Sequence, residues 1–195
     1  MAMLGKVKFK IRGVSPLILN NGHTADPLNE YAQRLKKLNS KRDKTEADYE
    51  KISREEWESC FYLDDDKKLI MPGDCIEAML YAAAAKTKGT TKKDLQAGAW
   101  VEGDAPLVTE MDGMSFDDAW KDGKFAFRKR VRIMRAQIVR TRPIFFKWSL
   151  GFTVTFLEDI LSKDRIIDLM NMSSYRIGMG DWRPKFGRFE ILTTS

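Results

Sequence analysis

The sequence predicts an α+β protein, in which an antiparallel sheet carries helices on one face in the chain order β-α-β-β-α-β, the ferredoxin-like arrangement. Three observations lead to this prediction. Residues 6–12 and 148–156 alternate between apolar and other side chains, as half-buried strands do. Residues 74–86 and 162–173 carry apolar side chains at helical spacing. Residues 22–60, a polar segment with mixed charges, predict a helical insertion after the first strand.

The composition is that of a globular protein with a basic balance. The chain has 195 residues and a net charge of +6, so we expect one domain over residues 1–195 and an anionic partner, although scattered lysines can also serve solubility alone. Its two cysteines fit neither a disulfide framework nor a zinc pattern, and His23 is the single histidine. With no apolar stretch of leader or membrane-span type, we expect a cytoplasmic location, no membrane association and no cofactor or metal.

The first predicted strand has one apolar and one basic side. Val7, Phe9 and Ile11 point one way, toward the expected core. The other side consists of Lys6, Lys8, Lys10 and Arg12. Lysines also protect solvated edge strands from aggregation, so the basic side has either that role or a role in binding.

The insertion is expected to contain two helices. Pro27 suits the first turn of the first helix, whose apolar spacing continues to Leu38. Thr45 and Asp48 resemble a capping pair for the second helix. The apolar residues that the second helix would bury are Tyr49, Ile52 and Trp57.

The middle of the chain carries weaker signals. Residues 61–71 predict a short hairpin around an acidic turn, and Asp74 is the expected N-cap of a helix that ends at Lys86. Within residues 89–124 we expect mostly loop, with weak strands at residues 100–101 and 106–108 and a helical turn at residues 117–120.

Two neighbouring predicted strands, residues 125–134 and 137–144, are rich in arginine. Arg128, Arg130 and Arg132 recur at every second position and would share one face. The remaining arginines of this region are Arg135, Arg140 and Arg142. We expect these strands at the centre of the sheet, with their arginines on the same open face as the basic side of the first strand. Arginine at period two is also consistent with a merely solvated face.

A glycine-rich segment, residues 177–189, follows the last predicted helix and precedes the closing strand. Its candidate contact residues are Gly178, Gly180, Trp182, Arg183, Lys185, Phe186 and Arg188. Glycine lets a ligand approach the backbone, cations bind phosphate, and flat rings stack on bases. The pattern lacks the third glycine and the strand-to-helix context of a dinucleotide fingerprint. We interpret the segment as a loop that grips an extended anion; the alternative is a tight turn with Trp182 packed on the core.

Three segments in this order resemble the RAMP superfamily, the RRM-derived proteins that form the RNA-binding backbone of CRISPR effector complexes. They are Val-Ser-Pro-Leu-Ile-Leu at residues 14–19, Pro-Gly-Asp at residues 72–74 and the glycine-rich segment at residues 178–189. The chain looks like a short member of the kind carried by phages, which would place it in the host cytoplasm. The resemblance leaves out residues 22–60. It implies an RRM-like fold, a nucleic-acid ligand and copies assembled side by side as a homo-oligomer or filament.

The leading hypothesis is sequence-tolerant binding of single-stranded RNA or DNA, in which cations contact phosphates and aromatic rings stack on bases. The residues expected to contact the strand are Lys8, Lys10, Arg12, Arg128, Arg130, Arg132, Arg135, Arg140, Arg142, Gly178, Gly180, Trp182, Arg183, Lys185, Phe186 and Arg188.

Two further hypotheses come from other classes. Some RAMP proteins cut RNA with an aspartate in the loop after the first strand and a divalent ion, and the resemblance gives Asp26, near His23, that role as the single catalytic candidate. Asp26 before Pro27 is equally explained as a helix N-cap. The third hypothesis is a structural subunit of a larger complex, whose basic groove holds an acidic segment of a partner protein.

Overall fold

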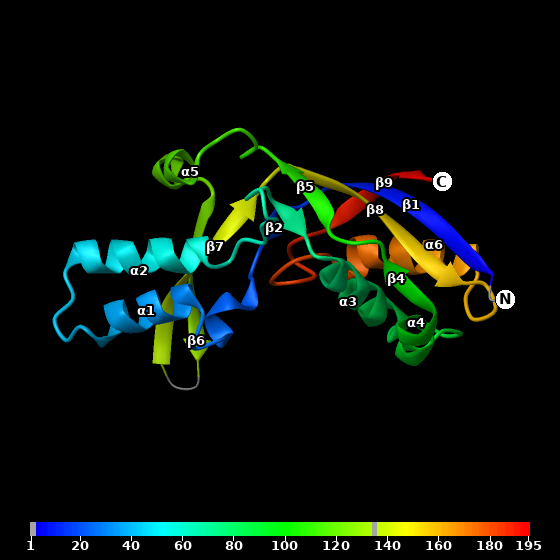
Figure 1. The fold of residues 1–195 in the computed structure, drawn as a ribbon, viewed down its shortest axis with the longest axis horizontal. Helices are drawn as coiled ribbons and strands as arrows, with labels where there is room; N and C mark the ends of the chain where they lie inside the picture. Colours follow the sequence, from blue (N-terminus) through cyan, green and yellow to red (C-terminus); the bar gives the residue numbers. More distant parts are fainter. Residues whose placement is uncertain (1–2, 134–135) are drawn as a thin grey trace. The chain divides into compact units, whose positions relative to one another are not determined.

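The computed structural model describes residues 3–133 and 136–195, with α-helices and antiparallel sheets (Figure 1). The α+β class is therefore confirmed. The chain forms two compact units. Unit 1 consists of Met1–Leu17, Leu63–Glu110 and Phe146–Ser195, and unit 2 consists of Ile18–Tyr62 and Met111–Phe145. Among the described residues, no helix combines the length and the apolar composition needed to cross a bilayer.

Unit 1 is an antiparallel sheet with helices. Its strands are β1 (Leu4–Gly13), β3 (Ile70–Met71), β4 (Ala99–Val101), β5 (Ala105–Thr109), β8 (Trp148–Leu157) and β9 (Phe189–Thr194). Its helices are α3 (Gly73–Ala84), α4 (Lys92–Gly98), α6 (Lys163–Met172) and a short π-helix, η2 (Ser173–Ile177). The strands lie in the order β3-β5-β8-β1-β9, and β4 also pairs with β8. The neighbouring strands β1 and β8 thus come from opposite halves of the chain.

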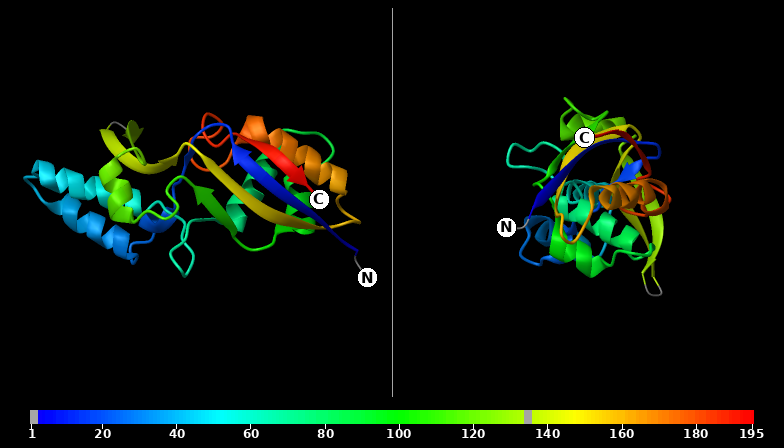
Figure 2. Two further views of the ribbon diagram at one scale, coloured as in Figure 1. Left: turned by 90° about the horizontal axis from the view of Figure 1, so that it is seen from above. Right: turned by 90° about the vertical axis from the view of Figure 1, so that its right-hand side faces the viewer.

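The core of unit 1 lies between this sheet and the helices α3 and α6, which share one face of it (Figure 2). The register of β1 and β8 sets Val7 opposite Val154 and Phe9 opposite Phe152, whose ring centroids are 5.6 Å apart. The helices cover these side chains with Ile76, Met79, Leu80, Ile166, Leu169 and Met170, all buried. Burial of each such side chain stabilises the fold by about 1.5–3 kcal/mol.

Unit 2 packs helices around a three-stranded sheet and an aromatic core. Its elements are β2 (Leu17–Ile18), the 3-10 helix η1 (Gly22–Ala25), α1 (Glu30–Ser40), α2 (Glu46–Glu58), α5 (Phe116–Asp122), β6 (Ala126–Ile133) and β7 (Ala136–Phe145). The sheet has the order β2-β7-β6. Trp57 packs edge-on against Phe61 at 4.7 Å between ring centroids, and its indole N–H donates to the carbonyl of Phe125 at 2.9 Å. The predicted helical segment 22–60 thus belongs to unit 2, while the single domain over residues 1–195 stays a prediction.

The expected place of the arginine-rich strands at the centre of the first strand's sheet is wrong. In unit 1 the neighbours of β8 are β1, β5 and β4, and the last two were expected only as weak strands. The arginine-rich strands β6 and β7 pair with each other in unit 2. The reason is that Lys129 and Arg130 are consecutive, so both faces of β6 carry charge. A central strand must bury one face and cannot have this pattern.

Several helix boundaries depend on caps that the sequence shows clearly. Thr45 and Asp48 form the expected capping box of α2, and Ser162 caps α6. The predicted N-cap at Asp74 is wrong, because α3 begins at Gly73 and its N-cap position is Pro72. The N–H of Gly73 donates to the Asp104 carboxylate at 3.0 Å.

Three further expectations in this part of the chain need correction. Tyr49 is not buried in α2, since 59% of its surface is exposed. The predicted hairpin at residues 61–71 is reduced to one bridge between Leu63 and Leu69. The helix α4, with a capping box of its own at Thr91 and Asp94, lies where only loop was expected.

Candidate nucleic-acid interface

The exposed side of β1 is a row of cations on the face of the sheet opposite the helices of unit 1. Lys6, Lys8, Lys10 and Arg12 are all exposed. Their direct neighbours across β8 are Thr155, Thr153, Gly151 and Ser149. Directly opposed residues share a face, so the cations stand above a column of short side chains. On the same face, Trp100 of β4 lies opposite Thr155 with 41% of its surface exposed.

The two ends of this row are ion-paired. The Lys6 ammonium lies 2.5 Å from the carboxylate of Glu102, which also accepts a 2.6 Å hydrogen bond from Thr155. The hydrogen bond from Lys6 lowers the pKa of Glu102. At the other end, Arg12 pairs with Glu190 of β9 at 2.5 Å. Exposed pairs of this kind are worth at most about 1 kcal/mol, so a polyanion can displace them.

The middle of the row is available for a ligand. Lys8 and Lys10 are exposed and form no ion pair with any described residue. Since both lie on a central strand that pairs with β8 in an unbroken register, their ammonium groups are presented by a paired strand rather than by a loop.

The glycine loop, residues 178–187, is closed by its own backbone. The N–H of Met179 donates to the carbonyl of Gly187 at 2.9 Å. Gly178, Gly180 and Gly187 have φ values of 75°, 76° and 73°, a region that favours glycine. A Cβ on Gly187 would lie 1.7 Å from the Met179 carbonyl oxygen. The loop's conformation therefore needs the glycines at these positions, whether or not a ligand approaches them.

The same loop is attached to the end of β1. The carbonyl of Arg188 accepts from Val14 at 2.8 Å, and its N–H donates to the Ser15 hydroxyl at 2.9 Å. The N–H of Gly187 donates to the carbonyl of Pro16 at 2.8 Å. The Ser-Pro segment and the glycine-rich segment, which the sequence singled out separately, are thus one structure at the Arg12 end of the cation row.

The side chains of the loop combine rings and cations. Trp182 and Phe186 are half-buried, with ring centroids 6.2 Å apart. The Lys185 ammonium lies 5.7 Å from the centre of the Phe186 ring. Arg183 is exposed and forms no ion pair with a described residue, while the Arg188 guanidinium donates to the carbonyl of Pro184 at 2.8 Å. The loop thus presents two rings that pack on each other beside exposed cations, and its role in gripping an anion stays a prediction.

The arginines of unit 2 fall on two faces of the hairpin formed by β6 and β7. Arg128, Arg130 and Arg132 share one face, and the register places Lys129 opposite Arg140 on the other. Arg128 pairs with Glu50 at 2.9 Å and lies 5.4 Å from the Trp120 ring. Arg130 is exposed and forms no ion pair with a described residue. Arg135 lies outside the described residues.

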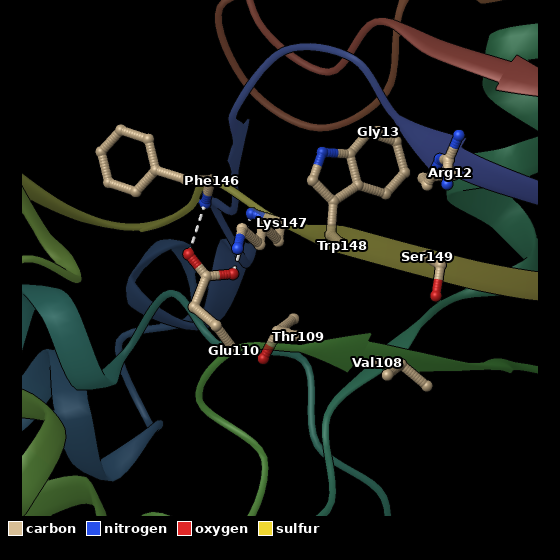
Figure 3. Close-up of a pocket in the computed structure, with 9 residues that line it drawn as sticks. All are labelled: Arg12, Gly13, Val108, Thr109, Glu110, Phe146, Lys147, Trp148 and Ser149. Carbon is tan, nitrogen blue, oxygen red and sulfur yellow. Dashed lines mark hydrogen bonds between the residues drawn. The ribbon is translucent and has the colours of Figure 1, made fainter.

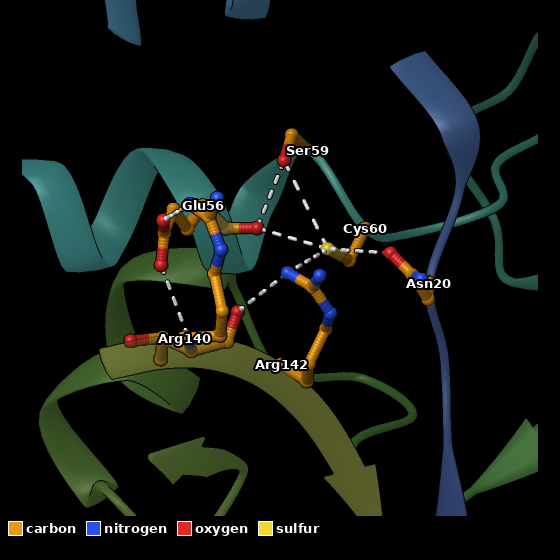
Figure 4. Close-up of polar contacts among 7 residues, drawn as sticks. Asn20, Glu56, Ser59, Cys60, Arg140 and Arg142 are labelled. Atoms are coloured by element: carbon orange, nitrogen blue, oxygen red, sulfur yellow. Dashed lines mark hydrogen bonds and ion pairs between the residues drawn. The ribbon is translucent and has the colours of Figure 1, made fainter. Parts of the chain in front are cut away.

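Arg140 and Arg142 have partners inside unit 2 (Figure 4). Arg140 pairs with Glu56, whose second carboxylate oxygen accepts from the backbone N–H of Thr141 at 3.1 Å. Arg142 donates to the sulfur of Cys60 at 3.4 Å. Burial raises the pKa of the Cys60 thiol, and the nearby Arg142 charge works against that shift. These two arginines therefore hold α2 against β7, and we assign them a structural role first.

Asp26 has a local structural role. Its carboxylate accepts a hydrogen bond from the N–H of Leu28 at 2.9 Å, while Asn29 caps α1, so the N-cap expectation for Asp26 is wrong. His23 is hydrogen-bonded to Asn21 at 2.8 Å. Within the described part of the chain, no cluster of three histidine, cysteine or acidic residues could hold a metal ion. Cleavage by Asp26 stays a prediction.

Sequence reasoning missed a set of residues beside the cation row. Phe146 and Lys147, which directly precede β8, line a pocket of about 380 Å³ together with Arg12, Val108 and Trp148 (Figure 3). The available signal in the sequence was a phenylalanine followed by a lysine. This pair could not predict the pocket, because the pocket joins three separate segments of the chain.

A scan against protein-family models found no match to this chain, and neither did a search of the curated proteins. The resemblance to the RAMP superfamily thus stays a prediction, and the function is argued from the geometry.

Proposed function

We propose that this protein binds single-stranded nucleic acid without strong sequence preference, and that the strand lies along the open face of unit 1. The observation that carries the proposal is the row Lys6, Lys8, Lys10 and Arg12 on a central strand, above a column of short side chains. Phosphates would follow the row, and release of their counterions would supply most of the affinity.

Aromatic side chains at both ends of the row favour a single strand over a duplex. Trp100 is exposed near the Lys6 end, and Trp182 and Phe186 belong to the loop at the Arg12 end. Unpaired bases can stack on such rings, at about 1–3 kcal/mol per base and with little sequence preference. Bases in a duplex are already stacked on one another and cannot stack on protein rings.

We further propose that unit 1 is a ferredoxin-like, RRM-like domain. Along the chain its main elements run β1-α3-β5-β8-α6-β9, and in the sheet β8 separates β1 from β5. This interleaving is the split β-α-β pattern of that fold. It supports the ferredoxin-like fold expected from the sequence, except that β5 takes the position in the sheet that was predicted for an arginine-rich strand.

The hairpin of unit 2 is proposed as a separate nucleic-acid contact of that unit, through Arg130 and Arg132, both exposed on one face. Assembly of copies along one strand remains a proposal that rests on the resemblance, and protein partners in a larger complex and a cytoplasmic location remain proposals as well. Assembly predicts that the number of bound copies rises with the length of the strand, which light scattering measures.

Fluorescence anisotropy tests the proposal with labelled oligouridylate and oligothymidylate of equal length, titrated with the protein at low ionic strength. We expect binding that weakens steeply as salt is added. A labelled acidic peptide is the control for general polyanion binding. No binding of either strand at low salt, or equal binding of the peptide, would contradict the proposal. Comparison of the two strands also separates RNA from DNA binding.

A further inference from the structure

The pocket at the Arg12 end of the open face has the size and the walls of a ligand site. Its volume of about 380 Å³ lies within the range of small-ligand pockets. It is formed at the beginning of β8, between the ends of β5 and β1, entirely within unit 1 (Figure 3). The cation row leads toward it, since Arg12 is the last member of the row and lines the pocket.

One wall of the pocket is fixed by Trp148. The indole is buried, and its N–H donates to the carbonyl of Ser15 at 2.9 Å. A Cβ on Gly13 would lie 2.1 Å from the indole nitrogen, so glycine at this position lets the ring lie directly against β1. Trp148 therefore cannot turn into the pocket and fill it.

Glu110 fixes the opposite wall. Its carboxylate accepts hydrogen bonds from the backbone N–H groups of Phe146 at 2.9 Å and Lys147 at 2.8 Å. Both carboxylate oxygens are thus engaged, which reduces their repulsion of an anion. The backbone of Phe146 and Lys147 is held in place, while 54% of the Phe146 surface is exposed.

The side chains that line the pocket are of two kinds. Phe146 and Val108 are apolar and 54% and 53% exposed, and Arg12 and Lys147 are cationic. A ligand that complements both is flat and apolar on one side and anionic on another. A nucleotide has this chemistry, with a base for the apolar wall and a phosphate for the cations.

We infer that one base of the bound strand stacks on the exposed ring of Phe146 at this pocket, while phosphates of the strand lie on Lys147 and Arg12. The inference rests on the proposed function and adds to it a defined nucleotide position. A strand that follows the cation row would reach the pocket at the end of β1 and turn one base out of its stack there.

The test compares a ligand with bases and a ligand without them. Phe146→Ala is expected to weaken binding of oligouridylate or oligothymidylate roughly 5- to 150-fold, the range for loss of one base–aromatic stack. The same variant should bind inorganic polyphosphate, which carries charge but no base, as the wild type does. Lys147→Ala should weaken binding of both ligands. Phe146→Tyr, which keeps the ring, should restore strand binding.

Tyr175→Ala is the matched control, because Tyr175 is an aromatic residue of unit 1 with 57% exposure that does not line the pocket. It should bind strands as the wild type does, and thermal unfolding should show that all variants are folded. If the wild type binds the strand and Phe146→Ala binds it equally well, the inference is overturned and the proposed function stands. Failure of the wild type to bind any strand would instead reject the proposed function.

Discussion

Glu56 and Arg140 form an ion pair that also completes the hydrogen bonding of β7. Glu56 is buried in α2, and its second oxygen accepts from the N–H of Thr141 at 3.1 Å. The carboxylate thus occupies the place that a neighbouring strand would take. An arginine that looked like a phosphate ligand in the sequence is part of the packing of unit 2.

Removal of this carboxylate should destabilise the protein. Glu56→Ala leaves a buried N–H unsatisfied and Arg140 without its partner, so we expect a loss of about 2–4 kcal/mol in the free energy of unfolding. Glu50→Ala is the control in the same helix, because the exposed Glu50–Arg128 pair is worth no more than about 1 kcal/mol. Urea unfolding measures both. Equal losses would show that Glu56 is not structural.

The close approach within the glycine loop gives a second prediction. Gly187→Ala would place a Cβ 1.7 Å from the Met179 carbonyl oxygen at a φ of 73°. Gly89 also has a positive φ, 89°, but lies in open space, so Gly89→Ala should lose about 1–2 kcal/mol of stability. We expect Gly187→Ala to lose clearly more stability than Gly89→Ala, as measured by thermal unfolding. It should also lose strand binding, as measured by anisotropy. Comparable losses in the two variants would mean that the loop adjusts easily.

Cys60 should resist alkylation in the folded protein. It is buried, and burial raises the pKa of its thiol, so little thiolate is present to react. Cys75 is less buried. With iodoacetamide at mildly alkaline pH, we expect Cys60 to react about tenfold or more slowly than in urea-unfolded protein. Mass spectrometry of the modified peptides gives both rates, and rapid native labelling of Cys60 would argue against the packing of α2 on β7.

Acid should unfold the protein through its capping and paired carboxylates. A hydrogen bond from Lys41 lowers the pKa of Asp48, and one from Arg54 lowers that of Asp117. A lowered folded-state pKa stabilises the protein above the unfolded-state value of about 4, and this stabilisation is lost as the pH falls further. We expect the melting temperature to fall below about pH 4. Asp48→Asn should be less stable than wild type at neutral pH, and this difference should vanish in acid; a constant difference would contradict the assignment.

Local signals in the sequence predicted most of the elements. The alternation of β1, the capping box at Thr45 and the cap at Ser162 depend on neighbouring residues, so a single sequence shows them. Strand order could not be read in this way. Charged residues on both faces of β6, Lys129 on one and three arginines on the other, were a visible sign that it is not a central strand, but β5 has only five residues and gave little competing signal.

The candidate site was predicted in part. The cation row and the glycine loop follow from single segments, and the structure brings them together at the Arg12 end of β1 through Ser15. The pocket did not follow, since Arg12, Val108 and Phe146 are joined only by strand pairing. The partners of Arg140 and Arg142 lie in α2 and at its end, far away in the sequence, so their structural role was hidden as well.

The central claim is that the row on β1 contacts phosphates, and the salt dependence of binding tests it most directly. Each phosphate contact with a single strand contributes about 0.7 to the slope of log K against log salt. Lys8→Ala/Lys10→Ala should therefore reduce the slope by about 1.4. The control Lys86→Ala/Lys163→Ala removes the same charge at the helices of unit 1 and should keep the wild-type slope. An unchanged slope in the first variant, or equal reductions in both, would contradict the account.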